Sequence, residues 1–134
     1  MSSTAEMLTT HPNNAGVDTS LLAETIEALI DCATTCTTCA DACLSEDSVA
    51  DLRACIRSDQ DCADICATTA QVLARFTGDN AVVVKQQLTT CITACSSCAE
   101  ECEAHADHHE HCRVCAEACR RCEQACADLL AVIA

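Results

Sequence analysis

Residues 32–43 read CATTCTTCADAC, and residues 91–102 repeat the pattern as CITACSSCAEEC. In both stretches, successive cysteines are separated by steps of 4, 3 and 4 residues. Side chains three and four residues apart share one face of an α-helix, so each stretch predicts a helix with a row of thiols along one side. Such a row takes the positions that apolar residues fill in the seam between packed helices, and the thiols are therefore predicted to face inward.

Two further segments carry cysteines with the same helical spacing. In residues 49–76, three cysteines share one face, and Asp59 stands where the regular pattern would place a fourth thiol. Residues 108–133 carry five cysteines in steps of 3, 4, 3 and 4. Because the third segment repeats the first and the fourth repeats the second, the chain contains a duplicated helical hairpin. The spacing predicts four helices, at about 19–43, 49–76, 80–106 and 108–133.

Three polar breaks separate these segments, at residues 44–48, 76–80 and 105–111. Asp107 and Glu110 in the third break have the spacing of a capping box, which predicts that a helix begins at Asp107. Four helices of this length with short connections are typical of an all-α, antiparallel up-down-up-down four-helix bundle. We expect this bundle, with its cysteine-lined core, to span residues 18–134 and to follow a flexible N-terminal tail at 1–17.

The position of the apolar residues predicts a polarity for the bundle. The first and third segments begin with leucine and valine and end in cysteine, whereas the second and fourth run the other way. In an antiparallel arrangement, all four apolar portions would therefore gather at one end. The histidines of the third break and Asp59 would gather toward the other end, where they would line a mouth to the thiol core.

Composition and charge exclude several classes of function. The formal net charge of −14 would repel phosphate backbones, so nucleic-acid binding is not expected. The sequence has no run of 18 apolar residues, so no membrane span is expected. Residues 1–16 lack the basic and apolar regions of a signal peptide, which predicts a cytoplasmic protein with reduced thiols. No Ser–His–Asp arrangement and no open metal site for a substrate is evident, so we do not expect an enzyme.

The number of thiols points to metal binding. Sixteen cysteines on matching helix faces exceed what small hydrophobic core residues would require. Cysteines four apart on a helix have Cβ atoms about 5–6 Å apart, whereas a disulfide needs about 3.5–4.5 Å. Zn(II) favours closed tetrahedral sites and iron–sulfur clusters favour looped cysteine runs, whereas Cu(I) accepts two or three thiolates along a row. The predicted Cu(I) ligands are Cys32, Cys36, Cys39, Cys43, Cys55, Cys62, Cys66, Cys91, Cys95, Cys98, Cys102, Cys112, Cys115, Cys119, Cys122 and Cys126.

The cysteine pattern resembles that of the bacterial copper storage proteins. The resemblance covers nearly the whole chain after the tail and includes both C-x3-C-x2-C-x3-C stretches and the five-cysteine segment. It implies a four-helix bundle that holds multiple Cu(I) ions per chain, a homotetramer in the cytosol, and a small copper chaperone as a partner. It also implies that copper passes a mouth formed by His105, His109 and His111 with Asp59 as an acidic neighbour, and His108 could replace one of the three.

Other interpretations remain open from the residues alone. The chain could be a zinc or cadmium buffer like a metallothionein, with about one ion per three or four cysteines. A redox enzyme or sensor would need a thiol of lowered pKa beside a cation, such as Arg113, Arg120 or Arg121. The histidines could be exposed loop residues, and Asp59 could form an ion pair with Arg53 or Arg57.

Overall fold

The computed structural model describes residues 2–134, and within them the regular secondary structure is entirely helical. It comprises five α-helices and one short 3₁₀ helix in the described part of the chain. In chain order these are α1 (Thr4–Thr10), α2 (Thr19–Leu44), η1 (Val49–Leu52), α3 (Arg53–Ala74), α4 (Ala81–Glu103) and α5 (Glu110–Val132). The four long helices therefore follow the four segments that the cysteine spacing predicts.

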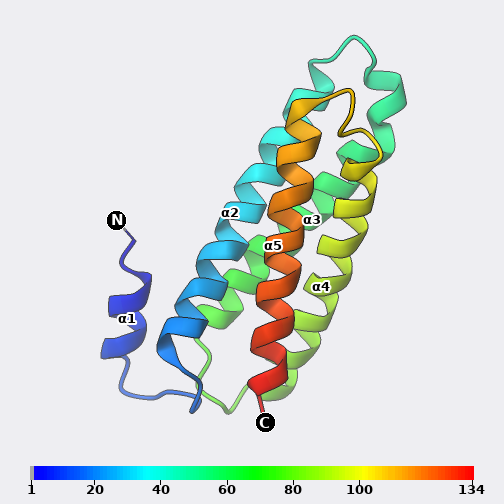
Figure 1. Cartoon of the computed structure of the whole chain (residues 1–134). Helices are drawn as coiled ribbons and strands as arrows, with labels where there is room; N and C mark the ends of the chain where they lie inside the picture. The colour runs from blue at the N-terminus through cyan, green and yellow to red at the C-terminus, as the bar shows by residue number, and fades with distance from the viewer. Residues whose placement is uncertain (1) are drawn as a thin grey trace.

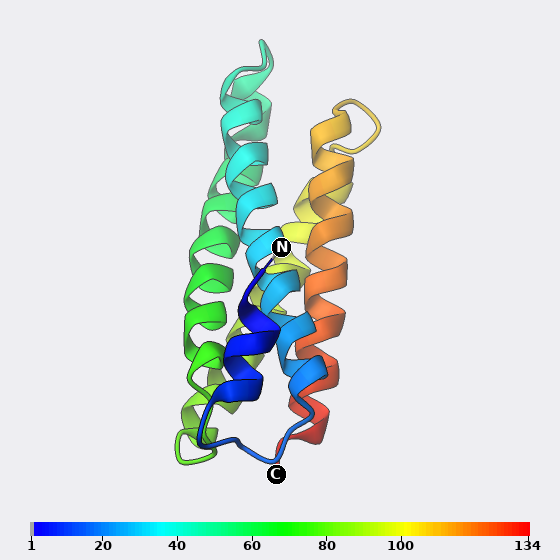
Figure 2. The same ribbon diagram turned by 90° about the vertical axis from the view of Figure 1, so that its left-hand side faces the viewer.

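The long helices lie side by side in an elongated bundle (Figure 1). Helix α2 packs against α3 and α5, and α4 packs against the same two helices. Figure 2 shows the two hairpins next to each other, with the connections at 45–52 and 104–109 at one end. We call this the mouth end. The connection at 75–80 and the C-terminus lie at the opposite end, which we call the apolar end.

Local interactions account for where two of the helices begin. At the start of α2, the Asp18 carboxylate accepts backbone hydrogen bonds from Ser20 (2.7 Å) and Leu21 (3.4 Å), which satisfies two of the unpaired N–H groups of the first turn. Helix α5 begins at Glu110, so the prediction of a start at Asp107 with a capping box is wrong. The backbone carbonyl of His105 accepts bonds from the next turn, including one from His109 N at 3.0 Å, and this tight turn delays the helix by three residues.

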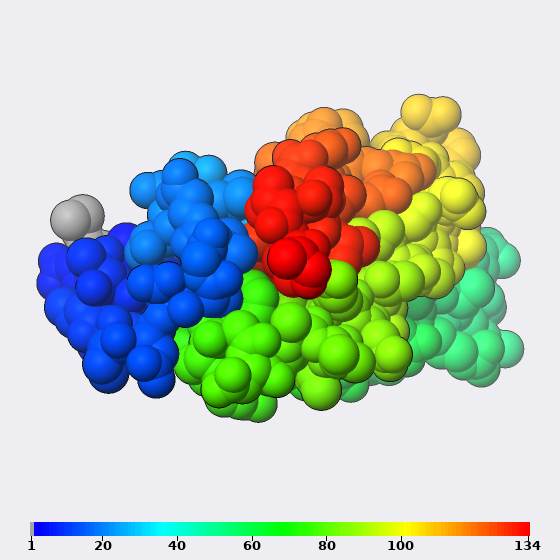
Figure 3. Space-filling view, turned by 90° about the horizontal axis from the view of Figure 1, so that it is seen from below, coloured from blue at the N-terminus to red at the C-terminus, as the bar shows by residue number. Residues whose placement is uncertain are grey.

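The N-terminal segment lies against the bundle. Where the sequence predicts a flexible tail at residues 1–17, the structure has helix α1, which packs along α2. Leu8, Ala15 and Val17 pack against the buried core. Seen from the apolar end, this segment lies at one side of the bundle, next to the start of α2, and the connection after α3 and the C-terminal residues face the viewer (Figure 3). The flexibility of this segment stays a prediction, and Met1 lies outside the described residues.

The core has two zones along the bundle axis. Toward the apolar end, four leucines with no exposed surface, one from each long helix, fill the interior: Leu29, Leu73, Leu88 and Leu129. The remainder of the interior is lined mainly by cysteines, every one of which is buried. Within residues 2–134, no helix combines the length and the apolar character needed to cross a membrane.

Candidate metal centre

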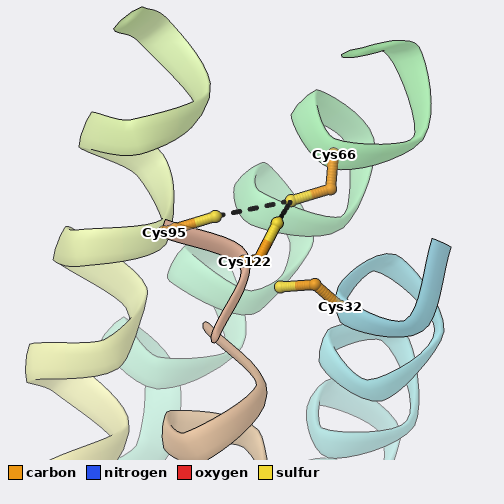
Figure 4. Close-up of side chains that lie close together, drawn as sticks. All are labelled: Cys32, Cys66, Cys95 and Cys122. Carbon is orange, nitrogen blue, oxygen red and sulfur yellow. Dashed lines mark hydrogen bonds between the residues drawn. The ribbon is translucent and has the colours of Figure 1, made fainter. Parts of the chain in front are cut away.

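The thiol zone is a column of free sulfur atoms contributed by all four long helices. Figure 4 shows one level of it, where Cys32, Cys66, Cys95 and Cys122 point toward one another from α2, α3, α4 and α5. The Sγ of Cys66 lies 3.6 Å from that of Cys95 and 3.9 Å from that of Cys122. All 16 cysteines are free and buried, so the inward orientation that the 3- and 4-residue steps predict is confirmed.

The levels of the column overlap rather than forming separate sites. Several sets of four ligand atoms lie within 4.8 Å of one another, and successive sets share members. Cys32 belongs with Cys66, Cys95 and Cys122 and also with a second set that contains Cys36 and Cys119. Sulfur distances of 3.6 Å join Cys36 to Cys119 and to Cys115 in the level beyond. Metal ions could therefore occupy neighbouring ligand sets along the column, because one cysteine can belong to two sets.

Asp59 lies inside the thiol column and is fully buried. One carboxyl oxygen accepts S–H bonds from Cys98 (3.2 Å), Cys115 (3.2 Å) and Cys102 (3.5 Å). Burial away from water, reinforced by the surrounding thiols, raises the pKa of the Asp59 carboxyl to about 9. The carboxyl is therefore protonated and neutral at pH 7 in the folded, copper-free protein, and it faces sulfur rather than the arginines with which it could have paired.

Burial also keeps two of the outer thiols, those of Cys43 and Cys112, protonated. Removal from water is the largest cause that raises the pKa of Cys43, to about 11, and it raises the pKa of Cys112 as well. Both lie at the mouth end of the column, beside Cys39 and His111 in one potential ligand set. A soft cation that binds here would displace thiol protons and would leave thiolates, which are the ligands that Cu(I) and Zn(II) prefer.

At the mouth end, His111 joins the thiol column to the surface. Its Nδ1 lies 3.5 Å from the Sγ of Cys39 and 3.6 Å from that of Cys112, while its Nε2 lies 3.0 Å from a carboxylate oxygen of Glu46. Burial lowers the pKa of His111, but the contacts with Cys39 and Glu46 outweigh it and raise the pKa above its usual value. The hydrogen bond from His111 in turn lowers the pKa of Glu46.

The three predicted mouth histidines differ in the residues that they contact. His109 lies beside His111, with ring centroids 5.5 Å apart, and its Nδ1 is 2.7 Å from the same Glu46 oxygen. His105 instead contacts Glu101, one helical turn earlier, at 3.4 Å. His108 is exposed.

Glu46 is the residue of the mouth that sequence reasoning missed. It lies in the polar break after α2, which the predicted bundle already placed at the same end as the histidines. The position of this break could therefore have indicated an acidic residue near the histidines. However, the break also contains Asp47, and only the fold distinguishes the carboxylate that reaches both imidazoles from its exposed neighbour.

Comparisons with known proteins agree with this geometry. The chain is 56% identical to the copper storage protein Ccsp from Streptomyces lividans, in a structure loaded with 10 copper equivalents. The match has a TM-score of 0.93 and covers 96% of this chain and 98% of that one. A second structure, the Cu(I)-bound copper storage protein BsCsp3, is 36% identical, with a TM-score of 0.70 over 80% of this chain and 95% of that one.

A further relative and a family profile complete the comparison. An uncharacterized cysteine-rich protein of Bacillus subtilis (strain 168), YhjQ, is 37% identical over 79% of this chain and 93% of its own length. The sequence profile of the family described as copper storage protein matches residues 18–131, which hold all 16 cysteines and the four long helices except the last residue of α5. The chain belongs to the copper storage protein family.

Proposed function

We propose that this protein stores Cu(I) at high capacity on its core thiolates and releases it through the mouth end. The observation that carries the proposal is that successive ligand sets share cysteines, as Cys32 and Cys36 do. A thiolate can bridge two neighbouring Cu(I) ions that each have two or three ligands, so all of the ligand sets can hold Cu(I) at the same time. Zn(II) needs four donors per ion, so even with some thiolates shared the same column would hold only about one Zn(II) per three or four cysteines.

The charge of the core supports the same choice of metal. Each Cu(I) that replaces a thiol proton leaves the buried charge unchanged, so the interior can fill without uncompensated charge. A Zn(II) ion held by four thiolates would leave two negative charges in the interior. In a chain with a formal net charge of −14, this excess is costly to bury.

The storage proposal includes an architecture and a set of ligands. The four long helices are proposed to form an antiparallel up-down-up-down bundle, which gathers the leucines at one end and the histidines at the other. The side chains proposed to bind copper are the 16 cysteines, with Asp59, His105, His109 and His111 along the path from the mouth. His111 has the strongest support among the histidines because its Nδ1 faces two thiols.

The proposal also includes the location, the assembly and the partner of the protein. A structure from Streptomyces lividans is of a cytosolic copper storage protein, 57% identical over 86% of this chain and 96% of that one, with a TM-score of 0.84. We infer a cytosolic location, a homotetrameric assembly, exchange of Cu(I) with a small copper chaperone, and a storage role without catalysis. A zinc or cadmium buffer remains the competing function.

Competition between the two metals tests the proposal against that buffer. Anaerobic, fully reduced protein is first saturated with Zn(II), which is expected to stop at about four or five ions for 16 thiols. Titration with Cu(I) is expected to release all of the zinc and to load more copper than the zinc displaced. Retention of the zinc, or exchange of one copper per zinc, would favour the buffer. Protein-bound metal is counted after gel filtration.

A further inference from the structure

One carboxylate holds both imidazoles of the mouth. The same Glu46 oxygen lies 2.7 Å from Nδ1 of His109 and 3.0 Å from Nε2 of His111. Glu46 belongs to the connection after α2, whereas both histidines lie at the start of α5. The contact therefore ties the first helical hairpin to the second across the opening to the thiol column.

The contact also fixes which ring nitrogen of His111 faces the thiols. A carboxylate only accepts hydrogen bonds, so the nitrogen that faces Glu46 carries the proton. In a neutral imidazole, that nitrogen is Nε2, and the lone pair is left on Nδ1. Nδ1 is the atom that lies against Cys39 and Cys112, in the outermost potential ligand set. A carboxylate behind a ligating histidine is the usual way in which proteins orient such a ring.

We propose that Glu46 is a positioning residue that holds His111 with its Nδ1 lone pair toward the outermost thiols, so that arriving Cu(I) is captured by His111, Cys39 and Cys112. The inference rests on the proposed storage of Cu(I). It assigns Glu46 a role in the rate at which copper enters the column and none in the number of ions that the column holds. His109 is held by the same carboxylate, and its Nε2 lies 3.5 Å from the Ser48 hydroxyl.

Substitution of Glu46 by glutamine tests this role, since it keeps the size of the side chain and removes the anionic acceptor. We expect Glu46→Gln to slow uptake of Cu(I) from a bicinchoninate complex by about tenfold, the low end of the effect of losing such a carboxylate. The final number of ions bound should not change. Stopped-flow absorbance measures the rate on anaerobic, reduced protein, and circular dichroism checks that the variant is folded.

Two matched controls separate positioning from simple attraction of the cation. Asp47→Asn removes the same charge one residue away, on an exposed side chain of the same connection. Asp107→Asn removes an exposed carboxylate from the other connection at the same end. Both are expected to leave the uptake rate close to that of the wild type. If either slows uptake as much as Glu46→Gln does, attraction by negative charge explains the effect and the positioning role is overturned.

A double-variant cycle and a spectroscopic readout complete the test. In a His111→Ala background, Glu46→Gln should cause no further slowing, because the role acts through His111. Nitrogen-15 NMR of the copper-free protein, at a pH where the imidazole is neutral, should show the proton of His111 on Nε2, and a mixture of tautomers in Glu46→Gln. Unchanged uptake in Glu46→Gln, or equal slowing in both backgrounds, would overturn the inference. A wild type that binds only a few ions would instead refute the storage function itself.

Discussion

Replacement of Asp59 by asparagine is expected to remove most of the pH dependence of stability of the copper-free protein between about pH 5 and 7.5. The Asp59 carboxyl has a pKa of about 9 in the folded chain, against about 3.9 for an aspartate in an unfolded chain. Between these values the folded state binds a proton that the unfolded state releases. The free energy of unfolding of the wild type therefore falls as pH rises.

The size of this effect follows from proton linkage. One group that is protonated in the folded state and ionised in the unfolded state changes stability by about 1.4 kcal/mol per pH unit. Over the stated range, the wild type should lose about 3.5 kcal/mol that Asp59→Asn does not lose. The thiols and His111 are the same in both proteins, so their titration cancels in the difference between the two curves.

Denaturant unfolding of both proteins at several pH values measures the difference. Asparagine keeps an acceptor oxygen for the thiols of Cys98 and Cys115, so the variant is expected to fold. A useful control is Asp61→Asn, which alters an exposed carboxylate on the same helix. If the wild-type and Asp59→Asn curves run parallel, the Asp59 carboxyl titrates normally and the proposed neutral state in the core is wrong.

Truncation of Leu88 to alanine is expected to lower the free energy of unfolding of the copper-free protein by about 2–5 kcal/mol. Leu88 has no exposed surface and lies in the apolar zone with Leu29, Leu73 and Leu129. Cysteine and alanine bury little apolar area per side chain, so a large share of the hydrophobic stabilisation falls on these few leucines. The loss should be close to that of a leucine deleted from any well-packed core.

Copper should restore much of what the Leu88→Ala change removes. Ligands that bind only the folded state add to its stability, and the variant retains all 16 thiols. We therefore expect an unchanged number of Cu(I) ions per chain and a thermal midpoint that rises on loading. Val82→Ala, at a side chain with 72% of its surface exposed, should change stability by less than about 0.5 kcal/mol. A reduced copper capacity in Leu88→Ala would show that the two zones of the core are not independent.

Helical periodicity was sufficient to predict the helices and the orientation of the cysteines. Residues spaced by 3 or 4 positions lie on the same face of a helix. This spacing placed all 16 thiols and Asp59 on the inward faces of the predicted helices, where the structure has them. The turn around Gly78 was equally readable, because its backbone angle φ of +94° is one that glycine adopts readily.

The details of the mouth could not be read from the sequence. The start of α5 at Glu110 depends on a turn closed by the carbonyl of His105, and a backbone acceptor leaves no signature in the side chains. The contact of Glu46 with His109 and His111 joins residues more than 60 positions apart, and local patterns carry no information at that range. Helix α1 depends on its packing along α2, which also lies beyond local propensity.

The measurement that tests the account most directly is an anaerobic titration of the fully reduced protein with Cu(I) against a chromogenic competitor. The bridged thiol column predicts an end point at roughly one Cu(I) per thiol, well above the number that separate sites could hold. Thiol titration before and after loading should show that the cysteines are reduced and then protected by metal. An end point at about four ions or fewer, the limit for closed four-thiolate sites, would contradict storage of Cu(I) along the column.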